Sequence, residues 1–436
     1  MKTKRFLALL MAGTLMLGAL AGCGGKNDAA STSDSGEIII NYPTYQCGTN
    51  TSAPVCDQLI AEFNEKYDGQ YEIKKEDVPG DQNYIDKIKV QLGTGDLPPV
   101  IYGGGYNLLD LVVAKDLAVD LTAAVEADAE WKALYSDMAL TTNSRDGKIY
   151  ASSAEGQVIG YFYNKDLFAK AGIDAPAETW DEFFDQCEKL KAAGITPISM
   201  DTADSAWVTQ LWMGAMVGTA SDAGLDLMKT MNPTDYNTPE MIDAAEKIQK
   251  LYQEYTTQDA IGGKYENAAN NFLSEQTAMI ANGPWMIGDF SDTTKTTAEF
   301  ADKVGVALFP EGFVYDAPIQ GYIVTKQDDP KLEEAAIEMV KFFTSAHAQQ
   351  VAMEMQGMVP ASGTVELTDV AKENYPLLAE FLAMTPDATA SSDTMQATMF
   401  PNLLDVLSQQ LPLLASGELD AAGFCQALTD AAAKNL

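Results

Sequence analysis

Short β-rich runs alternate with amphipathic helical patterns along this chain, and this alternation constrains the fold more than any other feature. The apolar run at 37–40 (EIII) predicts a buried strand, and residues 56–67 follow with the spacing of a helix that has one apolar face. Further strands are expected at 71–75 and 100–102, with a second helix between them. Such alternation is typical of α/β proteins. The residues therefore predict an α/β fold.

Two helix starts in the middle of the chain carry specific capping signals. Thr179 and Glu182 have the spacing of a capping box, and the helix they open is expected to end at Gly194. Thr238 followed by Pro239 predicts an N-cap and a first-turn proline for another helix. The remaining expectations are strands at 279–280, 304–308 and 319–324, a helix at 331–345 and a mainly helical segment after 360.

The first residues have the pattern of an export signal. Lys2, Lys4 and Arg5 precede an uncharged run at 6–21, which is shorter than the roughly 20 residues that a membrane-spanning helix needs. The small residues before Cys23 resemble the lipobox of bacterial lipoproteins, in which the cysteine receives a lipid. An ordinary signal peptide with an incidental cysteine is the alternative. We predict a signal peptide at 1–22 and a lipidated Cys23.

The segment after Cys23 is polar and rich in small residues. Residues 24–36 (GGKNDAASTSDSG) contain no apolar cluster, so they cannot bury enough surface to order themselves. Such a segment behaves as a flexible coil between an anchor and a folded body. The prediction is a linker at 23–36 and a body held on the extracellular face of the bacterial cytoplasmic membrane.

The charge balance narrows the kinds of partner. The chain has 436 residues, 28 basic against 63 acidic side chains and a formal net charge of −35. A field this negative argues against nucleic acid and anionic lipid as partners and favours a neutral or cationic ligand. With one histidine, five cysteines and no CxxC pair, structural zinc is not expected, and no cofactor is predicted.

The cysteines and the histidine give little sign of catalysis. Cys187 and Cys425 fall on apolar helix faces and are expected to be core thiols. Cys47 and Cys56 are close enough in sequence to form a disulfide, although a free pair is also compatible with the residues. His347 lies in a helical stretch, where a place on the helix surface is expected.

Several segments, taken together, resemble one known family. They are YFYNKDLFAKAGI at 161–173 with TWDEF at 179–183, AMIANGPW at 278–285, and SGELDAAGFCQAL at 416–428. Their content and order are similar to those of the family 1 extracellular solute-binding proteins, the maltose-binding-protein-like sugar receptors of ABC transporters. One position departs from the family pattern, because Pro99 stands where an acidic residue is usual. That departure weakens any ligand contact inferred for the neighbouring Asp96.

The resemblance implies a two-lobed, periplasmic-binding-protein-like fold (type II) with the ligand in a cleft between the lobes. It places one lobe at 37–150 plus 311–357 and the other at 151–310 plus 358–436. It also implies a monomeric binding protein, not an enzyme, that captures a carbohydrate by lobe closure and delivers it to ABC transporter permease subunits.

Sugar recognition needs aromatic rings for the apolar faces of a pyranose, and carboxylates or amides for its hydroxyls. Trp285 lies in the segment in which that family carries a stacking Trp, whereas Trp212 falls on a helix and fits a core position as well. Asp96, Glu155 and Gln320 are candidates for hydroxyl contacts. The full set of predicted ligand contacts is Trp285, Trp207, Glu155, Tyr45, Tyr102, Tyr106, Gln320, Tyr322, Trp212 and Asp96.

Other functions remain open at this level. A secreted glycosidase would need two carboxylates flanking the scissile bond, and a chain this acidic contains many such pairs. A binding protein for a non-sugar solute such as a polyamine would suit the negative charge. A surface protein that binds another protein would instead need a large exposed apolar patch.

Overall fold

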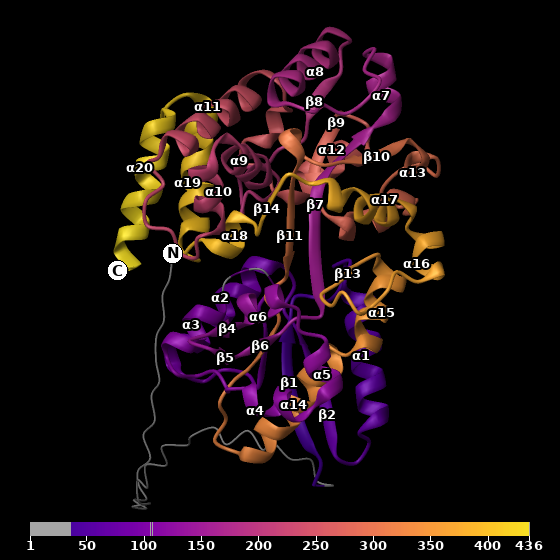
Figure 1. Cartoon of the computed structure of the whole chain (residues 1–436), viewed down its shortest axis with the longest axis vertical. Coiled ribbons are helices and arrows are strands. Elements are labelled where there is room, and N and C mark those ends of the chain that lie inside the picture. Colours follow the sequence, from indigo (N-terminus) through magenta and orange to yellow (C-terminus); the bar gives the residue numbers. More distant parts are fainter. Residues whose placement is uncertain (1–35, 105, 107, 436) are drawn as a thin grey trace, which may run out of the picture.

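The computed structural model describes residues 36–104, 106 and 108–435. The predicted signal peptide, Cys23 and nearly all of the predicted linker lie outside the described residues. Within the described part, no helix is both long and apolar enough to cross a membrane. Figure 1 shows two stacked bodies, which we call the lower body and the upper body, with a long strand running between them.

The lower body is built around two small sheets. In the first, β1 (Ile38–Thr44) and β2 (Tyr71–Asp77) pair in parallel, with Ile38 opposite Tyr71. In the second, β12 (Tyr322–Val324) lies between β3 (Val100–Tyr102) and β6 (Ala151–Ser152), antiparallel to both. The predicted strands at 37–40, 71–75 and 100–102 are confirmed, with shifts of a few residues at their ends.

Helices cover the sheets of the lower body. The predicted helix at 56–67 is present as α1, which buries Leu59 and Phe63. A later helix, α14, crosses from the C-terminal half of the sequence and packs on β1. The helices of the lower body and its short hairpin have these bounds: α1 Ala53–Lys66, α2 Asp81–Thr94, α3 Leu108–Ala114, α4 Thr122–Ala127, α5 Ala129–Ala133, α6 Asp137–Asn143, β4 Ser144–Arg145, β5 Lys148–Ile149, α14 Pro330–Phe343 and α15 Ala346–Gln356.

One long strand, β7 (Glu155–Asn164), organises the upper body. It pairs antiparallel with four other strands, and nine of its ten residues are buried. In Figure 1 it extends from the junction of the two bodies into the upper one. Its partners and the outer strands of the same sheet are β8 Thr196–Ile198, β9 Thr277–Asn282, β10 Val304–Ala307, β11 Phe313–Pro318, β13 Val359–Pro360 and β14 Ala390–Ser392.

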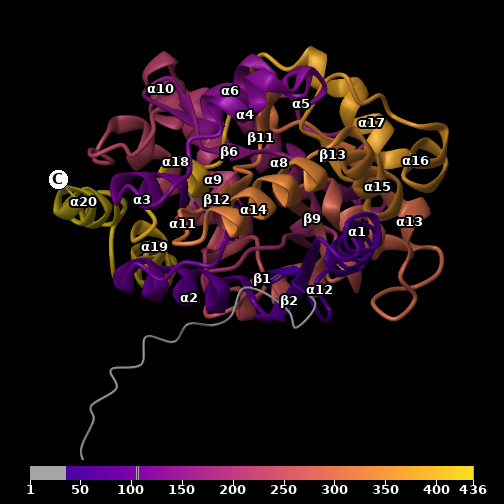
Figure 2. The same ribbon diagram turned by 90° about the horizontal axis from the view of Figure 1, so that it is seen from below.

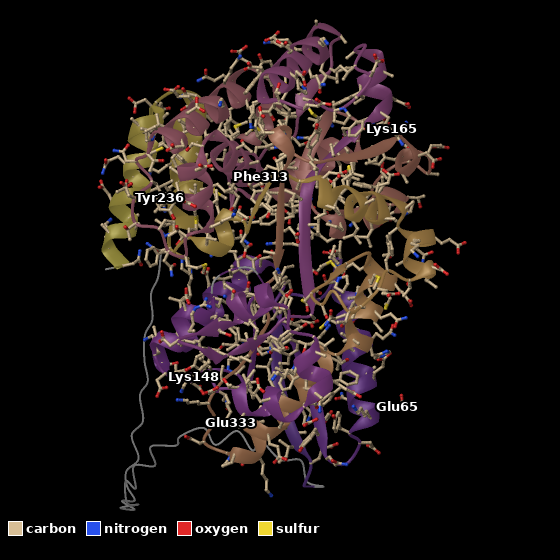
Figure 3. All side chains as sticks on the ribbon, viewed as in Figure 1. Glu65, Lys148, Lys165, Tyr236, Phe313 and Glu333 are labelled. Atoms are coloured by element: carbon tan, nitrogen blue, oxygen red, sulfur yellow. The ribbon has the colours of Figure 1, made fainter. Side chains whose placement is uncertain are left out.

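The sequence prediction missed five strands of this sheet, which are β7, β8, β11, β13 and β14. It expected a crossing between lobes at 151–153, and β7 begins directly after that point. It also expected a strand at 319–324, whereas the structure has β11 at Phe313–Pro318 and the short β12. Phe313, labelled in Figure 3, and Tyr315 belong to the apolar cluster of the upper body. The predicted lobe boundary at 311 therefore precedes a segment that packs with the other lobe.

The helices of the upper body begin and end where local signals are strong. Thr179 accepts a hydrogen bond from the Glu182 amide at 3.2 Å, and Thr238 accepts one from the Met241 amide at 3.3 Å. Gly194 has φ of +75°, as a left-handed helix end requires. The helices are α7 Lys165–Lys170, α8 Trp180–Ala192, α9 Trp207–Ala220, α10 Asp222–Lys229, α11 Pro239–Glu254, α12 Tyr265–Leu273, α13 Phe300–Lys303, α16 Asp369–Asn374, α17 Pro376–Met384, α18 Met395–Thr398, α19 Leu403–Ser416 and α20 Ala421–Ala432.

The cysteines and the histidine lie largely where the sequence predicted them. Cys187 and Cys425 are buried on helices, and Cys47 and Cys56 are buried free thiols, so they do not form the disulfide that the sequence left open. His347 lies on the exposed face of α15, 2.7 Å from the Glu62 carboxylate of α1. It joins two surface helices and lies outside the cleft described below.

Candidate ligand-binding cleft

A cleft of about 650 Å³ lies where the two bodies meet. The lower body contributes the loop after β1 and the start of α2, and the upper body contributes the start of α9 and much of α12. Viewed from below, α2 and α12 lie at the same edge of the molecule (Figure 2). Residues of β7 and the segment before β12 line the junction. Any molecule held in this cleft would touch both bodies.

Tyrosine rings form the wall that belongs to the lower body. The ring centroid of Tyr45 lies 6.0 Å from that of Tyr102 and 6.3 Å from that of Tyr106. Tyr84 supports Tyr45 from behind at 5.4 Å, edge to face. Tyr45, Tyr102 and Tyr106, all predicted as ligand contacts, therefore line the same side of the cleft.

Gly104 allows Tyr45 to pack tightly against the turn after β3. Its φ is +57°, and a Cβ built at this position would lie 2.8 Å from the Tyr45 hydroxyl oxygen. Only glycine tolerates both conditions without strain. The Gly103 and Gly104 amides also donate to the carbonyls of Gly321 and Gln320, which fixes the turn against the segment before β12.

We expect Gly104→Ala to destabilise the protein by roughly 1–3 kcal/mol and to displace Tyr45 from its place in the wall. Gly69→Ala is the matched control, because Gly69 also has positive φ, at +75°, but no atom lies within 4 Å of the place that an added Cβ would take. Melting curves and ligand titration of the two variants separate backbone strain from displacement of the ring. Equal effects in both would contradict this role for Gly104.

Two tryptophans form the facing wall in the upper body. The ring centroids of Trp207, at the start of α9, and Trp285 are 5.9 Å apart and tilted by 51°. The Trp207 indole nitrogen donates to the Asn282 side-chain oxygen at 3.3 Å. The Trp285 ring folds back over Gly283, where a Cβ would lie 2.4 Å from the ring. Both rings are half-buried and keep apolar surface open to the cleft.

Trp285 and Tyr45 occupy a special place between the two apolar cores. The smaller core lies in the lower body, and the larger one fills the upper body and extends into part of the lower. Both Trp285 and Tyr45 are partly buried and pack against each of these cores. Trp285 belongs to the upper body and also packs against the core of the lower body, so this ring touches both bodies.

Acidic and amide side chains lie on the floor of the cleft, along β7. Glu155 is only 8% exposed and accepts a hydrogen bond from the Tyr102 hydroxyl at 2.9 Å. Burial raises the pKa of Glu155, and the bond from Tyr102 opposes that rise. Gln157 donates to Asp393 at 2.6 Å, and burial raises the pKa of Asp393 to about 7. These polar groups suit a ligand that offers several hydrogen-bond donors.

A family model described as bacterial extracellular solute-binding protein matches residues 58–380, which is more than half of the chain. The chain belongs to the bacterial extracellular solute-binding proteins. The predicted family resemblance is thereby confirmed, and this family consists of binding proteins that act outside the cytoplasm.

Curated relatives of this solute-binding protein are distant but extend over most of its length. A binding protein of Brucella abortus is 24% identical over 413 residues, covering 93% of this chain and 94% of the relative. The sn-glycerol-3-phosphate-binding periplasmic protein UgpB of Brucella melitensis is 24% identical over 298 residues, covering 62% of this chain and 66% of the relative.

Solved structures share the fold of this solute-binding protein. A chitin oligosaccharide binding protein superposes with a TM-score of 0.81 at 22% identity, covering 91% of this chain and 98% of the other. A Streptococcus pneumoniae solute-binding protein in complex with the blood group A-trisaccharide gives 0.78 at 20% identity, covering 91% and 100%. The predicted two-lobed fold of the type II class is confirmed.

Four predicted contacts of this solute-binding protein lie outside the cleft and are corrected here. Trp212 is fully buried among aromatic rings of the upper core, because α9 is buried along most of its length. Tyr322 is buried between Tyr102 and the α14 side chain Phe343. Gln320 points into the lower body, where its side-chain oxygen accepts from the Leu109 amide at 3.0 Å. Asp96 is exposed in the loop after α2, away from the cleft.

The sequence analysis also missed residues that line the cleft. Asp81 begins α2 and accepts a hydrogen bond from the Tyr106 hydroxyl. Lys264, Tyr265 and Glu266 come from the start of α12. An acidic residue at a helix start reads as a cap, so no local signal distinguished Asp81 from ordinary capping residues. Within the described residues, no group of three or more His, Cys, Asp or Glu side chains is placed to hold a metal ion.

Proposed function

We propose that this solute-binding protein captures a carbohydrate, an oligosaccharide, in the cleft and delivers it to the permease of an ABC importer. The observation that carries the proposal is the pair of facing aromatic walls, Tyr45 with Tyr102 and Tyr106 on one side and Trp207 with Trp285 on the other. Aromatic faces cover the apolar C–H faces of pyranose rings, which few other soluble ligands present.

The remaining lining supports a ligand with many hydroxyls. The cleft volume of about 650 Å³ lies within the roughly 300–1,000 Å³ typical of small-molecule pockets. Side-chain amides can both donate and accept, as a hydroxyl requires. Those that line the cleft are Gln46, Asn50, Gln82, Asn83, Gln157, Asn270 and Gln396.

The relatives bear on the ligand class in different ways. One similar structure is a chitin oligosaccharide binding protein, and another is a solute-binding protein in complex with the blood group A-trisaccharide. UgpB is named for a phosphate ester. In this chain the cleft carries more carboxylates than lysines, which disfavours a phosphate. The carbohydrate class is therefore the one we assign.

Capture by closure requires contacts from both bodies, since a ligand drives closure only through tighter contacts in the closed state. The predicted lobes, 37–150 and 151–310 with 358–436, change at their junctions. We assign 37–152 to the first lobe, because β6 pairs with β12 in the lower body, and 153–318 with 358–436 to the second. The return to the first lobe, predicted at 311–357, is moved to begin at Ile319, because Phe313 and Tyr315 pack in the upper core. Rotation would take place about β7 and β11, which lead out of the junction.

The test is a thermal-shift screen of mono- and oligosaccharides with the purified protein. A ligand present at 100 times its Kd stabilises the native state by about 2.7 kcal/mol, which gives a clear rise in melting temperature. Unchanged sugar after incubation separates capture from hydrolysis. A melting temperature that no sugar raises would contradict the assignment, and cleavage products would support a glycosidase instead.

We also propose that Cys23 carries a lipid and that the segment up to residue 36 tethers a monomeric body at the extracellular face of the membrane. Cys23→Ser is expected to release the protein from the membrane fraction and to abolish incorporation of a labelled palmitate analogue. Cys187→Ser is the control, because that buried thiol is not available for acylation. Retention of Cys23→Ser in the membrane fraction would contradict the anchor.

A further inference from the structure

The charges that line the cleft are unbalanced. Lys264 lies 3.2 Å from Asp204, and Lys295 lies 2.6 Å from Asp289, so each lysine already has a carboxylate partner. In the described part of the chain no lysine or arginine pairs with the other carboxylates of the lining. These three are Asp81, Glu155 and Glu266.

Two of these carboxylates face each other from opposite sides of the cleft. Asp81 starts α2 in the lower body, and Glu266 lies in the first turn of α12 in the upper body. Asp81 keeps exposed surface, but desolvation by the protein around it raises its pKa; the hydrogen bond from Tyr106 opposes that rise, and the negative charges of Glu266 and Asp204 add to it. Like charges across a cleft oppose its closure unless a positive group lies between them.

The third carboxylate, Glu155, points at the ligand space from the floor. One of its oxygens, Oε2, accepts from the Tyr102 hydroxyl, while Oε1 has no hydrogen-bond partner among the described residues. The side chain is 8% exposed and borders the cleft. A carboxylate oxygen that borders the cleft and has no donor among the described residues can accept a hydrogen bond from a ligand, so this position favours a ligand that supplies a donor.

The aromatic rings of the cleft are also open to a cation. Tyr45 lines the cleft together with both acidic residues, and burial and the charges of Asp81 and Glu155 raise its pKa. In the described residues, lysine ammonium groups lie over Tyr67, Phe184, Tyr255 and Phe342, all outside the cleft. A ligand cation over the tyrosine wall would gain a cation–π attraction that no side chain supplies now.

We propose that the cleft prefers a carbohydrate that carries a protonated amine, an amino sugar with a free ammonium group, over its neutral counterpart. This inference rests on the proposed carbohydrate-binding function and narrows its ligand class. An ammonium group offers three donors and a positive charge where a hydroxyl offers one donor and none. Charge-assisted hydrogen bonds are about twice as strong as neutral ones.

The experiment compares matched ligands by isothermal titration calorimetry on the purified full chain. The ligands are a chitosan disaccharide with free amines, the same disaccharide with both amines acetylated, and cellobiose, which has hydroxyls in place of the amines. We expect the free-amine sugar to bind about tenfold more tightly than either neutral sugar. Added salt should reduce this preference, because salt screens charge interactions at the cleft mouth.

Three variants locate the source of the preference. Asp81→Asn and Glu155→Gln each remove one carboxylate that has no basic partner. Each should bring the ratio of the affinities for the free-amine and the neutral disaccharides close to one. Glu65→Gln is the matched control, because it removes one negative charge from the exposed face of α1, away from the cleft (Figure 3). The control should leave the ratio unchanged.

The outcomes separate this inference from the proposed function. Equal affinity for the three sugars overturns the amine preference and leaves carbohydrate capture intact. Binding of spermidine with no binding of any sugar in the wider panel overturns the proposed function itself. No binding of any of these ligands contradicts both, and a preference that survives in both cleft variants contradicts the role of Asp81 and Glu155.

Discussion

Trp285→Ala is expected to weaken binding of the tightest sugar of the panel roughly 30- to 1,000-fold, the roughly 2–4 kcal/mol that buried Trp anchors contribute at other interfaces. Trp285 is half-buried, stacks near Trp207 and packs against the apolar cores of both bodies. Its removal deletes a stacking surface and a contact between the two bodies. Calorimetric titration of the variant measures the loss.

Two further measurements make this prediction specific. Trp285→Phe keeps an aromatic face and should retain much of the affinity. The melting temperature of Trp285→Ala without ligand should fall far less than the affinity does, since part of the ring is already open to the cleft. Unchanged sugar affinity in Trp285→Ala would remove the main support for the two aromatic walls as the sugar-binding surfaces.

Trp212→Ala is expected to destabilise the fold by roughly 3–5 kcal/mol, the range for large aromatic side chains removed from a core. The ring is fully buried, with centroids 5.0 Å from Phe183, 5.1 Å from Phe309 and 5.3 Å from Tyr161. Alanine would leave a cavity among these rings. Chemical denaturation of the ligand-free protein measures the effect.

The matched variant is Trp212→Phe. The indole nitrogen of Trp212 is buried and has no hydrogen-bond partner, so phenylalanine removes an unsatisfied donor and keeps most of the ring volume. It should therefore cost far less than alanine. A Trp212→Ala variant that keeps its stability but no longer binds sugar would contradict our assignment of this residue to the core.

The comparison of Trp212 with Trp285 shows where sequence reasoning reaches its limit. Caps are local, and for this reason Thr179, Thr238 and Gly194 were predicted at the right positions. Whether a tryptophan faces a cleft or a core depends on segments far away in the sequence. The local sequence favoured the cleft for Trp285 and allowed either place for Trp212, and only the tertiary packing shows that Trp212 lies in the core.

The strands and acidic residues that were missed have a related cause. β7 contains two glycines and no polar alternation, because both of its faces are buried. Asp81 and Glu266 face each other only because of how the two bodies meet. In the sequence, each acid looks like an ordinary residue at a helix start. The fold class, the family and the tyrosine wall were within reach of the sequence. The charge balance of the cleft was not.

The position of β12 has a consequence for how the chain matures. This strand lies between β3 and β6. In the chain it follows β11 of the upper body, and the next helix, α14, packs on β1. The lower body therefore lacks the central strand of this sheet until β12 has left the ribosome, and β1 lacks the helix that covers it until α14 has followed as far as Phe343. Contacts between such distant segments form slowly. Nascent chains should thus remain open and vulnerable to proteases late into synthesis, a window that suits translocation before folding.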